Sequence, residues 1–169
     1  MSQYKRPDDW EAPVVLPEAP DLGRILVPFD GSHTAERALA WSVLAAHNND
    51  AEIVVVVAFD PPLTMRGRGA AFIESVQAGL LEEAQTLAEE SVLLLRQKGV
   101  RARGVVVRGD VARGILQVAD DEAVDLIVIG RQGLTHEVGG GVERVRRIMV
   151  GGVSEKVSRH AAVPVLVVV

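Results

Sequence analysis

The regular alternation of two hydrophobic patterns along residues 23–169 is the feature that most restricts how this chain folds. Short apolar runs typical of buried strands occupy residues 24–29, 52–59, 100–108, 124–129 and 163–169. Between them, apolar residues three and four apart predict helices over 32–47, between 69 and 99, over 111–120 and over 151–160. Strands that alternate with helices need right-handed crossovers, and strands apolar on both faces belong in a parallel sheet. We therefore expect an α/β fold with a doubly wound five-stranded parallel sheet in the order 3-2-1-4-5.

The first 22 residues have a different character from the rest. They contain Pro7, Pro13, Pro17 and Pro20, a spacing that blocks a continuous helix and favours an extended path. The remaining length suits one domain with its own core. We therefore expect an N-terminal extended arm over residues 1–22 and one folded domain over residues 23–169.

Composition excludes several classes of function. The 169 residues include no cysteine, which removes disulfide scaffolds, thiolate metal sites and cysteine nucleophiles. A formal net charge of −5 at pH 7 disfavours nucleic acid as a partner. No apolar run approaches the roughly 20 residues of a membrane span, and the first ten residues lack a signal-peptide pattern. We expect a cytoplasmic protein with no membrane partner, and surface positions for the four histidines, which show no metal-ligand spacing: His33, His47, His136 and His160.

The expected strand order fixes where a ligand would bind. It puts the topological switch between strands 1 and 4, and ligands of open α/β sheets bind there, outside the carboxyl ends of the strands. Strand 1 is followed by Asp30-Gly31-Ser32 and strand 4 by Gly130-Arg131-Gln132-Gly133. These two segments are the predicted binding site.

A third segment has the composition of a phosphate site. Gly151-Gly152-Val153-Ser154 stands at the start of the last predicted helix. Glycines allow backbone amides to approach phosphate oxygens, and a helix N-terminus adds its dipole and its unpaired N–H groups. A phosphate-bearing ligand is therefore the chemistry that this segment favours.

Together these motifs resemble the universal stress protein family. The family opens with a strand ending in Val-Pro-x-Asp-Gly-Ser and closes with a Gly-x-x-Gly loop, nine residues, Gly-Ser/Thr, a Ser-Glu-Lys-Val helix and a Val-Pro-Val-Leu-Val strand. The matching segments here are Val27–Ser32, Gly130–Gly133, Gly151–Val157 and Val163–Val167. The likeness runs from about Gly23 to the end of the chain.

The resemblance implies ATP or AMP as the ligand, with Mg as a further candidate. It implies that Asp30 faces the adenosine or the metal and that main chain near Ala58 reads adenine. It also implies that the glycine loop holds ribose and phosphates. The implied binding residues are Asp30, Ser32, Ala58, Gly130, Gly133, Arg147, Gly151, Gly152, Val153 and Ser154, and Asp30 is the implied metal ligand.

Two departures from the family pattern concern the phosphate loop. Seventeen residues separate Gly133 from Gly151, which makes an insertion of eight, and Gly152 replaces the family's Ser/Thr. Loss of that hydroxyl should cost roughly 1.5 to 3 kcal/mol of binding free energy. Arg144, Arg146 and Arg147 are candidate replacements, because guanidinium groups match phosphate geometry. We expect residues 134–145 to form a flap over the phosphates.

Each of these residues also has a purely structural interpretation. Asp30 can cap a turn or a helix, Gly130 and Gly133 can form a tight turn, and the arginines can lie on a solvated face. The motifs of other nucleotide and hydrolase classes are absent. The chain has no Gly-x-x-x-x-Gly-Lys-Ser/Thr loop, no third glycine after Gly67-Arg-Gly69, and Lys156 where a nucleophile elbow requires glycine. The loops of the related nucleotidyl-transfer enzymes, His-x-Gly-His and Ser-Gly-Gly-x-Asp-Ser, are absent too.

The sequence leaves three hypotheses of function. The first is a nucleotide-binding regulator of the stress response, and the second is a dimeric interaction module of the same fold that binds no nucleotide. The third is a slow ATPase, for which Asp30 is the one obvious base. A homodimer is expected through the apolar edge strand Val163–Val169. The competing arrangement folds the segment from Trp10 to Leu16 over that edge and leaves a monomer.

Overall fold

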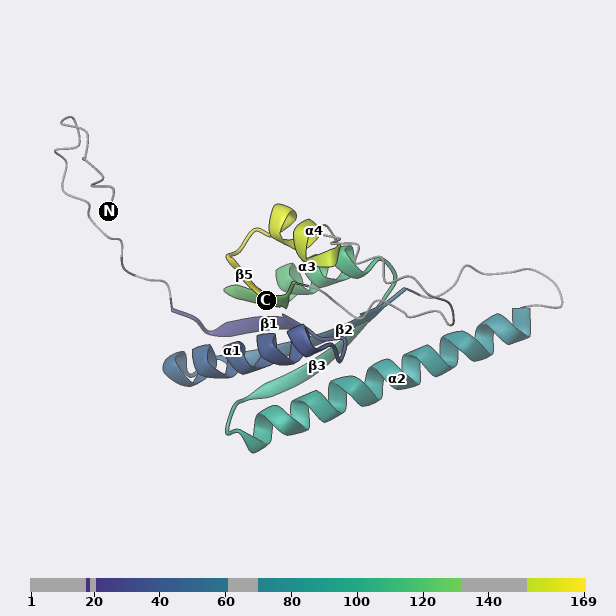
Figure 1. Ribbon diagram of the computed structural model, residues 1–169, viewed down its shortest axis with the longest axis horizontal. Coiled ribbons are helices and arrows are strands. Elements are labelled where there is room, and N and C mark those ends of the chain that lie inside the picture. Colours follow the sequence, from purple (N-terminus) through teal and green to yellow (C-terminus); the bar gives the residue numbers. More distant parts are fainter. Residues whose placement is uncertain (1–17, 19–20, 61–69, 132–151) are drawn as a thin grey trace, which may run out of the picture.

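The computed structural model describes residues 18, 21–60, 70–131 and 152–169. In these residues strands and helices alternate along the chain (Figure 1). The elements are β1 (Arg24–Pro28), α1 (His33–Asn49), β2 (Glu52–Phe59), α2 (Ala70–Gln97), β3 (Ala102–Arg108), α3 (Val111–Asp121), β4 (Leu126–Gly130), α4 (Val153–His160) and β5 (Val165–Val168). The predicted alternation of element types is therefore confirmed.

The five strands form one parallel sheet in the order β3-β2-β1-β4-β5. This order confirms the predicted doubly wound α/β fold. The chain moves outward from β1 to β3, then returns across β1 to β4 and β5, so the direction of winding reverses between β1 and β4. Both β3 and β5 are edge strands among the described residues.

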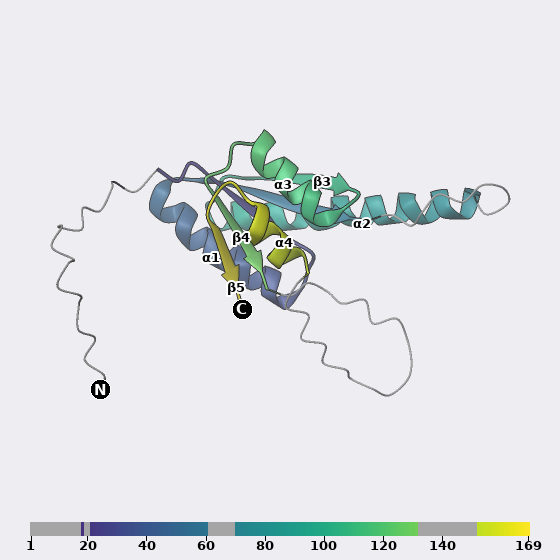
Figure 2. The ribbon, with the colours of Figure 1, turned by 90° about the horizontal axis from the view of Figure 1, so that it is seen from above.

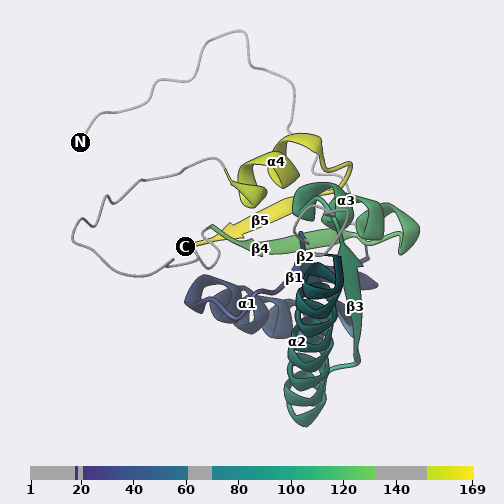
Figure 3. The same ribbon diagram turned by 90° about the vertical axis from the view of Figure 1, so that its right-hand side faces the viewer.

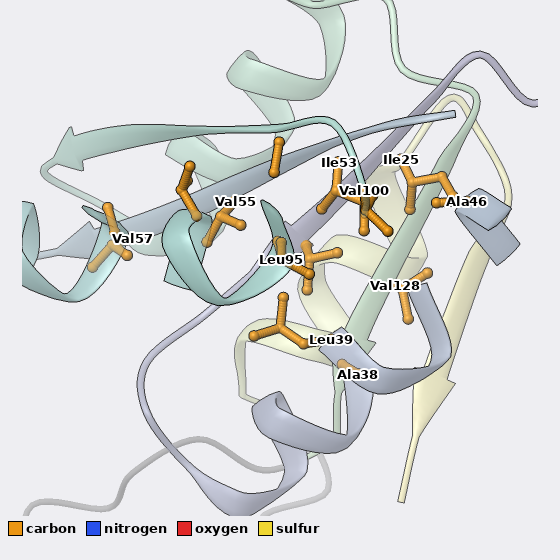
Figure 4. Packing of buried hydrophobic residues seen from close by; sticks show 14 of the residues in the cluster. Ile25, Ala38, Leu39, Ala46, Ile53, Val55, Val57, Leu95, Val100 and Val128 are labelled. Atoms are coloured by element: carbon orange, nitrogen blue, oxygen red, sulfur yellow. The ribbon is translucent and has the colours of Figure 1, made fainter. Parts of the chain in front are cut away.

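Helices cover both faces of the sheet (Figure 3). On one face α1 lies over β1, β4 and β5 while α2 lies over β2 and β3, and α3 and α4 cover the other face. The strand β2 shows why its sequence is an unbroken apolar run. Ile53, Val55 and Val57 belong to the core under α1 and α2, part of which Figure 4 shows, whereas Val54 and Val56 belong to the core under α3 and α4.

Turn chemistry accounts for the ends of the helices. Ser32 precedes α1 as its N-cap, so the helix starts one residue later than predicted. Asp50 at φ 51 ends α1, and Gly99 at φ 76 follows α2 in the left-handed conformation that glycine adopts without cost. Val153 begins α4 two residues after the predicted start, with Gly152 as N-cap.

Only part of the apolar side of α2 is buried. The helix contributes Ala84, Ala88, Val92 and Leu95 to the core, whereas Leu94 is 51% exposed. Its N-terminal half extends past the sheet (Figure 2) and leaves Ile73, Val76 and Leu80 half-buried. The spacing of apolar residues predicts which residues share a side of a helix. It does not predict how far along the helix the sheet extends. Within the described residues, no helix combines the length and the hydropathy that a membrane crossing requires.

Candidate nucleotide site at the carboxyl ends of the strands

The segment after β1 is a tight turn organised by Asp30. Oδ1 of Asp30 accepts a hydrogen bond from the backbone N–H of Ser32 at 3.0 Å. Gly31 between them has φ 77, a conformation that residues with a side chain rarely adopt. The carboxylate is half-buried at the end of the strand, so the turn fixes a negative charge at the switch point.

Ser32 links this turn to helix α1. Its Oγ accepts a hydrogen bond from the backbone N–H of Ala35 at 3.2 Å, and the side chain is 7% exposed. A serine at this position satisfies one of the N–H groups that a helix start leaves unpaired. The structure therefore gives Asp30 the turn role that was its structural alternative and gives Ser32 a capping role, and Asp30 lies at the end of β1 as predicted.

Gly130 at the end of β4 is required by close packing. A Cβ at this position would lie 2.8 Å from the carbonyl carbon of Thr34 and 2.9 Å from the backbone nitrogen of Ala35. The start of α1 thus rests directly on the end of β4. This contact brings the segment after β1 against the segment after β4, which is the convergence that the predicted switch-point site needs.

Helix α4 is tied to the same place. Oγ of Ser154, in its first turn, donates to the carbonyl oxygen of Arg131 at 3.0 Å, and the N–H of Arg131 donates to the carbonyl of Val168 at 2.7 Å. Its N-cap, Gly152, is exposed, and a Cβ there would meet no atom of the described residues within 4 Å. The first turn of α4 therefore lies beside the end of β4, with the backbone at Gly152 on the surface of the described structure.

The main chain of Ala58 is directed toward the site. In β2 the even-numbered residues form hydrogen bonds with the β1 segment. The first is donated by the N–H of Glu52 to Gly23, and the last is accepted by the carbonyl of Val56 from Phe29 at 2.8 Å. Odd-numbered residues bond to β3, and the carbonyl of Phe59 accepts from Gly109. By this alternation the N–H and C=O of Ala58 point toward the β1 side, beyond the last β1–β2 bond.

The described candidates thus gather at one end of the sheet: Asp30, Ser32, Ala58, Gly130, Gly152, Val153 and Ser154. Gly133, Arg147 and Gly151 lie outside the described residues, as do Arg144, Arg146, the proposed flap over 134–145 and most of the N-terminal arm. Reasoning from sequence did not single out Thr34 or Arg131. Arg131 lies within the glycine motif and could have been chosen from it, whereas no pattern in the sequence indicates that Thr34 contacts Gly130.

The described part of the site offers a metal ion few protein ligands. Among residues 21–60, 70–131 and 152–169, no group of three or more His, Asp and Glu side chains is placed to hold a metal ion. Mg²⁺ commonly binds through one or two carboxylates together with phosphate oxygens and water. A single carboxylate, Asp30, fits that mode of binding and does not fit a site made of protein ligands alone. His33, His47 and His160 are exposed, while His136 is outside the described residues.

This geometry defines the class of protein before any comparison: a doubly wound α/β domain whose candidate residues gather at the topological switch point of the sheet. The universal stress protein family matches residues 22–169. A universal stress protein of Thermus aquaticus is 34% identical over 145 residues, covering 85% of this chain and 96% of the relative. The chain therefore belongs to the universal stress protein family, as its motifs indicated.

Two solved structures place the fold within the same family. The universal stress protein UspA from Lactobacillus plantarum superposes with a TM-score of 0.74 at 20% identity, covering 89% of this chain and 100% of that one. A universal stress protein from Archaeoglobus fulgidus, in complex with dAMP, superposes with a TM-score of 0.60 at 20% identity, covering 89% and 100%. At this identity the likeness concerns the fold.

Proposed function

We propose that this chain binds an adenine nucleotide, ATP or AMP, at the carboxyl ends of β1, β2 and β4, and acts as a nucleotide-dependent regulator of the stress response. One observation carries the proposal. Gly130 brings the Asp30 turn against the end of β4, and Ser154 ties the open start of α4 to the same strand end. An acidic turn, the ends of parallel strands and a helix N-terminus are three features that favour nucleotide binding.

Each surface suits one part of the ligand. The open N–H and C=O of Ala58 offer a donor and an acceptor to an adenine edge. The backbone N–H groups at Gly152–Ser154, with the dipole of α4, suit phosphate oxygens. Asp30 would bind ribose hydroxyls or share Mg²⁺ with the phosphates, and the ion's role would be to neutralise phosphate charge. Gly133, Arg147 and Gly151 remain proposed members of the phosphate site on the resemblance alone.

The Archaeoglobus fulgidus relative supports the choice of an adenine nucleotide, since its structure contains dAMP. Its fold covers 89% of this chain, which supports the same class of ligand here. Release of bound nucleotide from the purified protein by acid, followed by chromatography, tests the proposal. We expect ATP or AMP in near-stoichiometric amount, or uptake after incubation with Mg·ATP. Protein that neither carries nor takes up adenine nucleotide would leave the interaction module as the better account.

A homodimer through β5 is the second part of the proposal. The outer side of β5 pairs with no strand among the described residues, and Leu166, Val167 and Val169 are 42%, 38% and 58% exposed. Trp41, 52% exposed, adds to this surface. It lies seven residues after Thr34 on the same side of α1, the side that faces β4 and β5. Exposed apolar side chains next to an unpaired edge favour a second copy there.

Light scattering of the wild type and of Leu166→Asp tests this dimer. We expect Leu166→Asp to remove pairing through β5, because it places two carboxylates near the two-fold axis in an apolar contact. Trp41→Ala should weaken the pairing without abolishing it. Glu36→Ala, an exposed change elsewhere on α1, is the matched control. An assembly mass that is unaffected by Leu166→Asp would rule out the β5 dimer.

A further inference from the structure

A groove of ≈ 520 Å³ lies along the other edge of the sheet, where α2 passes over β3. Its walls include Gln85, Glu89, Val92 and Arg96 from α2, and Gly104 and Val106 from β3. Gly104 shapes the groove because it has no side chain. A Cβ there would lie 3.1 Å from Cβ of Ala88, so glycine allows α2 to approach the strand and leaves no side chain at this point of the edge.

The backbone along this edge is available for pairing. The carbonyl of Arg101 accepts from Ile53 and the N–H of Gly109 donates to Phe59, so odd-numbered residues of β3 bond to β2. Even-numbered residues therefore point outward. The outward carbonyl of Ala102 already accepts from Nη2 and Nε of Arg96, at 3.0 and 3.3 Å. Gly104 and Val106 follow, and no hydrogen bond within the described part of the chain uses their outward groups.

We propose that a second copy of this chain adds its own β3 to this edge, antiparallel, about a two-fold axis at Val105. This register pairs Gly104 with the second copy's Val106 and the reverse, so it uses the outward N–H and C=O of both residues in both chains. Gly104 and Val106 point to the α2 face, because they alternate with residues that pack under α3. Each Val106 side chain then lies over the opposite Gly104 and fills the groove.

The charges of α2 complement each other in the same register. Gln77 accepts from Arg108, and Ala88 packs against Gly104, so α2 runs antiparallel to β3. Val105 is about 3.3 Å beyond Gly104, or about two helix residues of 1.5 Å each, so the axis passes close to Gln85. Along α2, Glu74 precedes that point by about as many residues as Arg96 follows it. Both are exposed, and 22 residues place them on nearly the same side of α2.

The two-fold axis thus sets Glu74 of each chain opposite Arg96 of the other, within the reach of long side chains. This complementarity favours a copy of the same chain over an unrelated extended peptide. The two-fold symmetry forms the Glu74–Arg96 pair twice, once on each side of the axis. The pairing does not depend on nucleotide binding. It is also compatible with a dimer through β5, which is the opposite edge of the sheet. Use of both edges would extend one continuous sheet through successive copies.

Sedimentation velocity in the Leu166→Asp background isolates the β3 pairing, because that change removes the β5 contact. We expect this protein to form dimers whose proportion rises with concentration. Glu74→Arg and Arg96→Glu should each raise the dimer Kd by roughly tenfold, since each reversal turns two attractions into repulsions. The double variant Glu74→Arg/Arg96→Glu should restore the Kd. Glu90→Arg, exposed on another side of α2, is the control and should leave the Kd unchanged.

The same reversals in the wild-type background should reduce species larger than a dimer to a dimer, which gives a second measurement that needs no change at Leu166. Thermal unfolding of each variant checks that the chain stays folded. Three results would overturn the proposal: a monomer at every concentration in the Leu166→Asp background, a Kd insensitive to the single reversals, or a double variant that pairs no better than the singles.

Discussion

The two ends of the parallel sheet are built from different interactions. At the amino end, ion pairs between charged side chains link the first residues of β1, β2 and β3. Arg24 of β1 forms ion pairs with Glu52 of β2 and with Glu122 after α3, at 3.4 and 3.7 Å. Arg103 of β3 pairs with the same two carboxylates: its Nε lies 3.5 Å from Glu52, and both of its terminal nitrogens, Nη1 and Nη2, donate to Glu122. Four side chains from distant segments thus form one network.

The carboxyl end is held by backbone geometry instead. Its contacts are the Asp30 turn, the Ser32 cap, the close packing at Gly130 and the Ser154–Arg131 bond. The network of Arg24, Glu52, Arg103 and Glu122 lies wholly at the amino end. The difference teaches how one sheet can divide its tasks: paired charges hold the amino end together, whereas the carboxyl end, held by turn, cap and main-chain contacts, carries the proposed nucleotide site.

Gly130→Ala should cause the largest effect and should affect both stability and binding. The added Cβ would lie 2.8 to 2.9 Å from main-chain atoms of Thr34 and Ala35, which cannot move without displacing α1. We expect a loss of about 3 kcal/mol in the free energy of unfolding, measured by urea denaturation. Gly79→Ala in α2 is the control. Outside the helix's own backbone, no atom of the described residues lies within 4 Å of its added Cβ, so this change should stabilise by up to about 1 kcal/mol. Equal stability of the two variants would remove the packing role of Gly130.

Asp125→Ala should destabilise the amino end alone. One carboxylate oxygen of Asp125 accepts from the N–H groups of Gly23 and Arg24, at 2.8 and 2.9 Å. Because the side chain is partly exposed, we expect a loss of about 1 to 2 kcal/mol in the free energy of unfolding. Asp125→Asn keeps an acceptor and should lose less. Reduced nucleotide affinity in either variant would contradict the separation between the two ends.

The Arg103–Glu122 pair should produce a small effect that depends on pH. The hydrogen bond from Arg103, with the positive charges of Arg103 and Arg24, holds the pKa of the Glu122 carboxyl below its ordinary value. The stabilisation is therefore complete above the unfolded pKa of about 4.3 and is lost as pH falls through the lower folded pKa. Denaturation of wild type and Glu122→Gln across pH 3 to 7, roughly the span of carboxyl titration, should show a stability difference that disappears in acid. A difference that persists at the acid end would exclude the ion pair as its source.

The sequence was sufficient to predict the strand order because each strand has a recognisable local pattern of apolar residues. The valine run of β2 is apolar on both faces, and its predicted bounds, Glu52–Phe59, are those of the structure. The turn residues Asp30, Gly31 and Ser32 were equally visible, since each has a fixed local preference. These signals involve neighbours along the chain, which is the range at which periodicity and turn chemistry operate.

Contacts between distant segments were not predictable in the same way. Arg103 and Glu122 are 19 residues apart and Gly23 and Asp125 are 102 apart, and charged residues alone do not indicate their partners. The sequence showed Gly130 as a loop glycine, whereas its Cβ is excluded by Thr34 across the fold. The direction of the Ala58 main chain depends on where β1 ends relative to β2, and that is a property of register.

Calorimetric titration with Mg·ATP of the wild type, Asp30→Asn and Asp125→Asn tests the central claim most directly. Asparagine at position 30 keeps an acceptor for the Ser32 N–H and replaces the carboxylate by a neutral amide, so we expect the turn to be preserved. We predict roughly micromolar binding to the wild type, weakened by about 1 to 3 kcal/mol in Asp30→Asn. We predict unchanged affinity in Asp125→Asn, whose change lies at the opposite end of the sheet. Equal affinity of all three proteins, or a loss confined to Asp125→Asn, would contradict nucleotide binding at the carboxyl end.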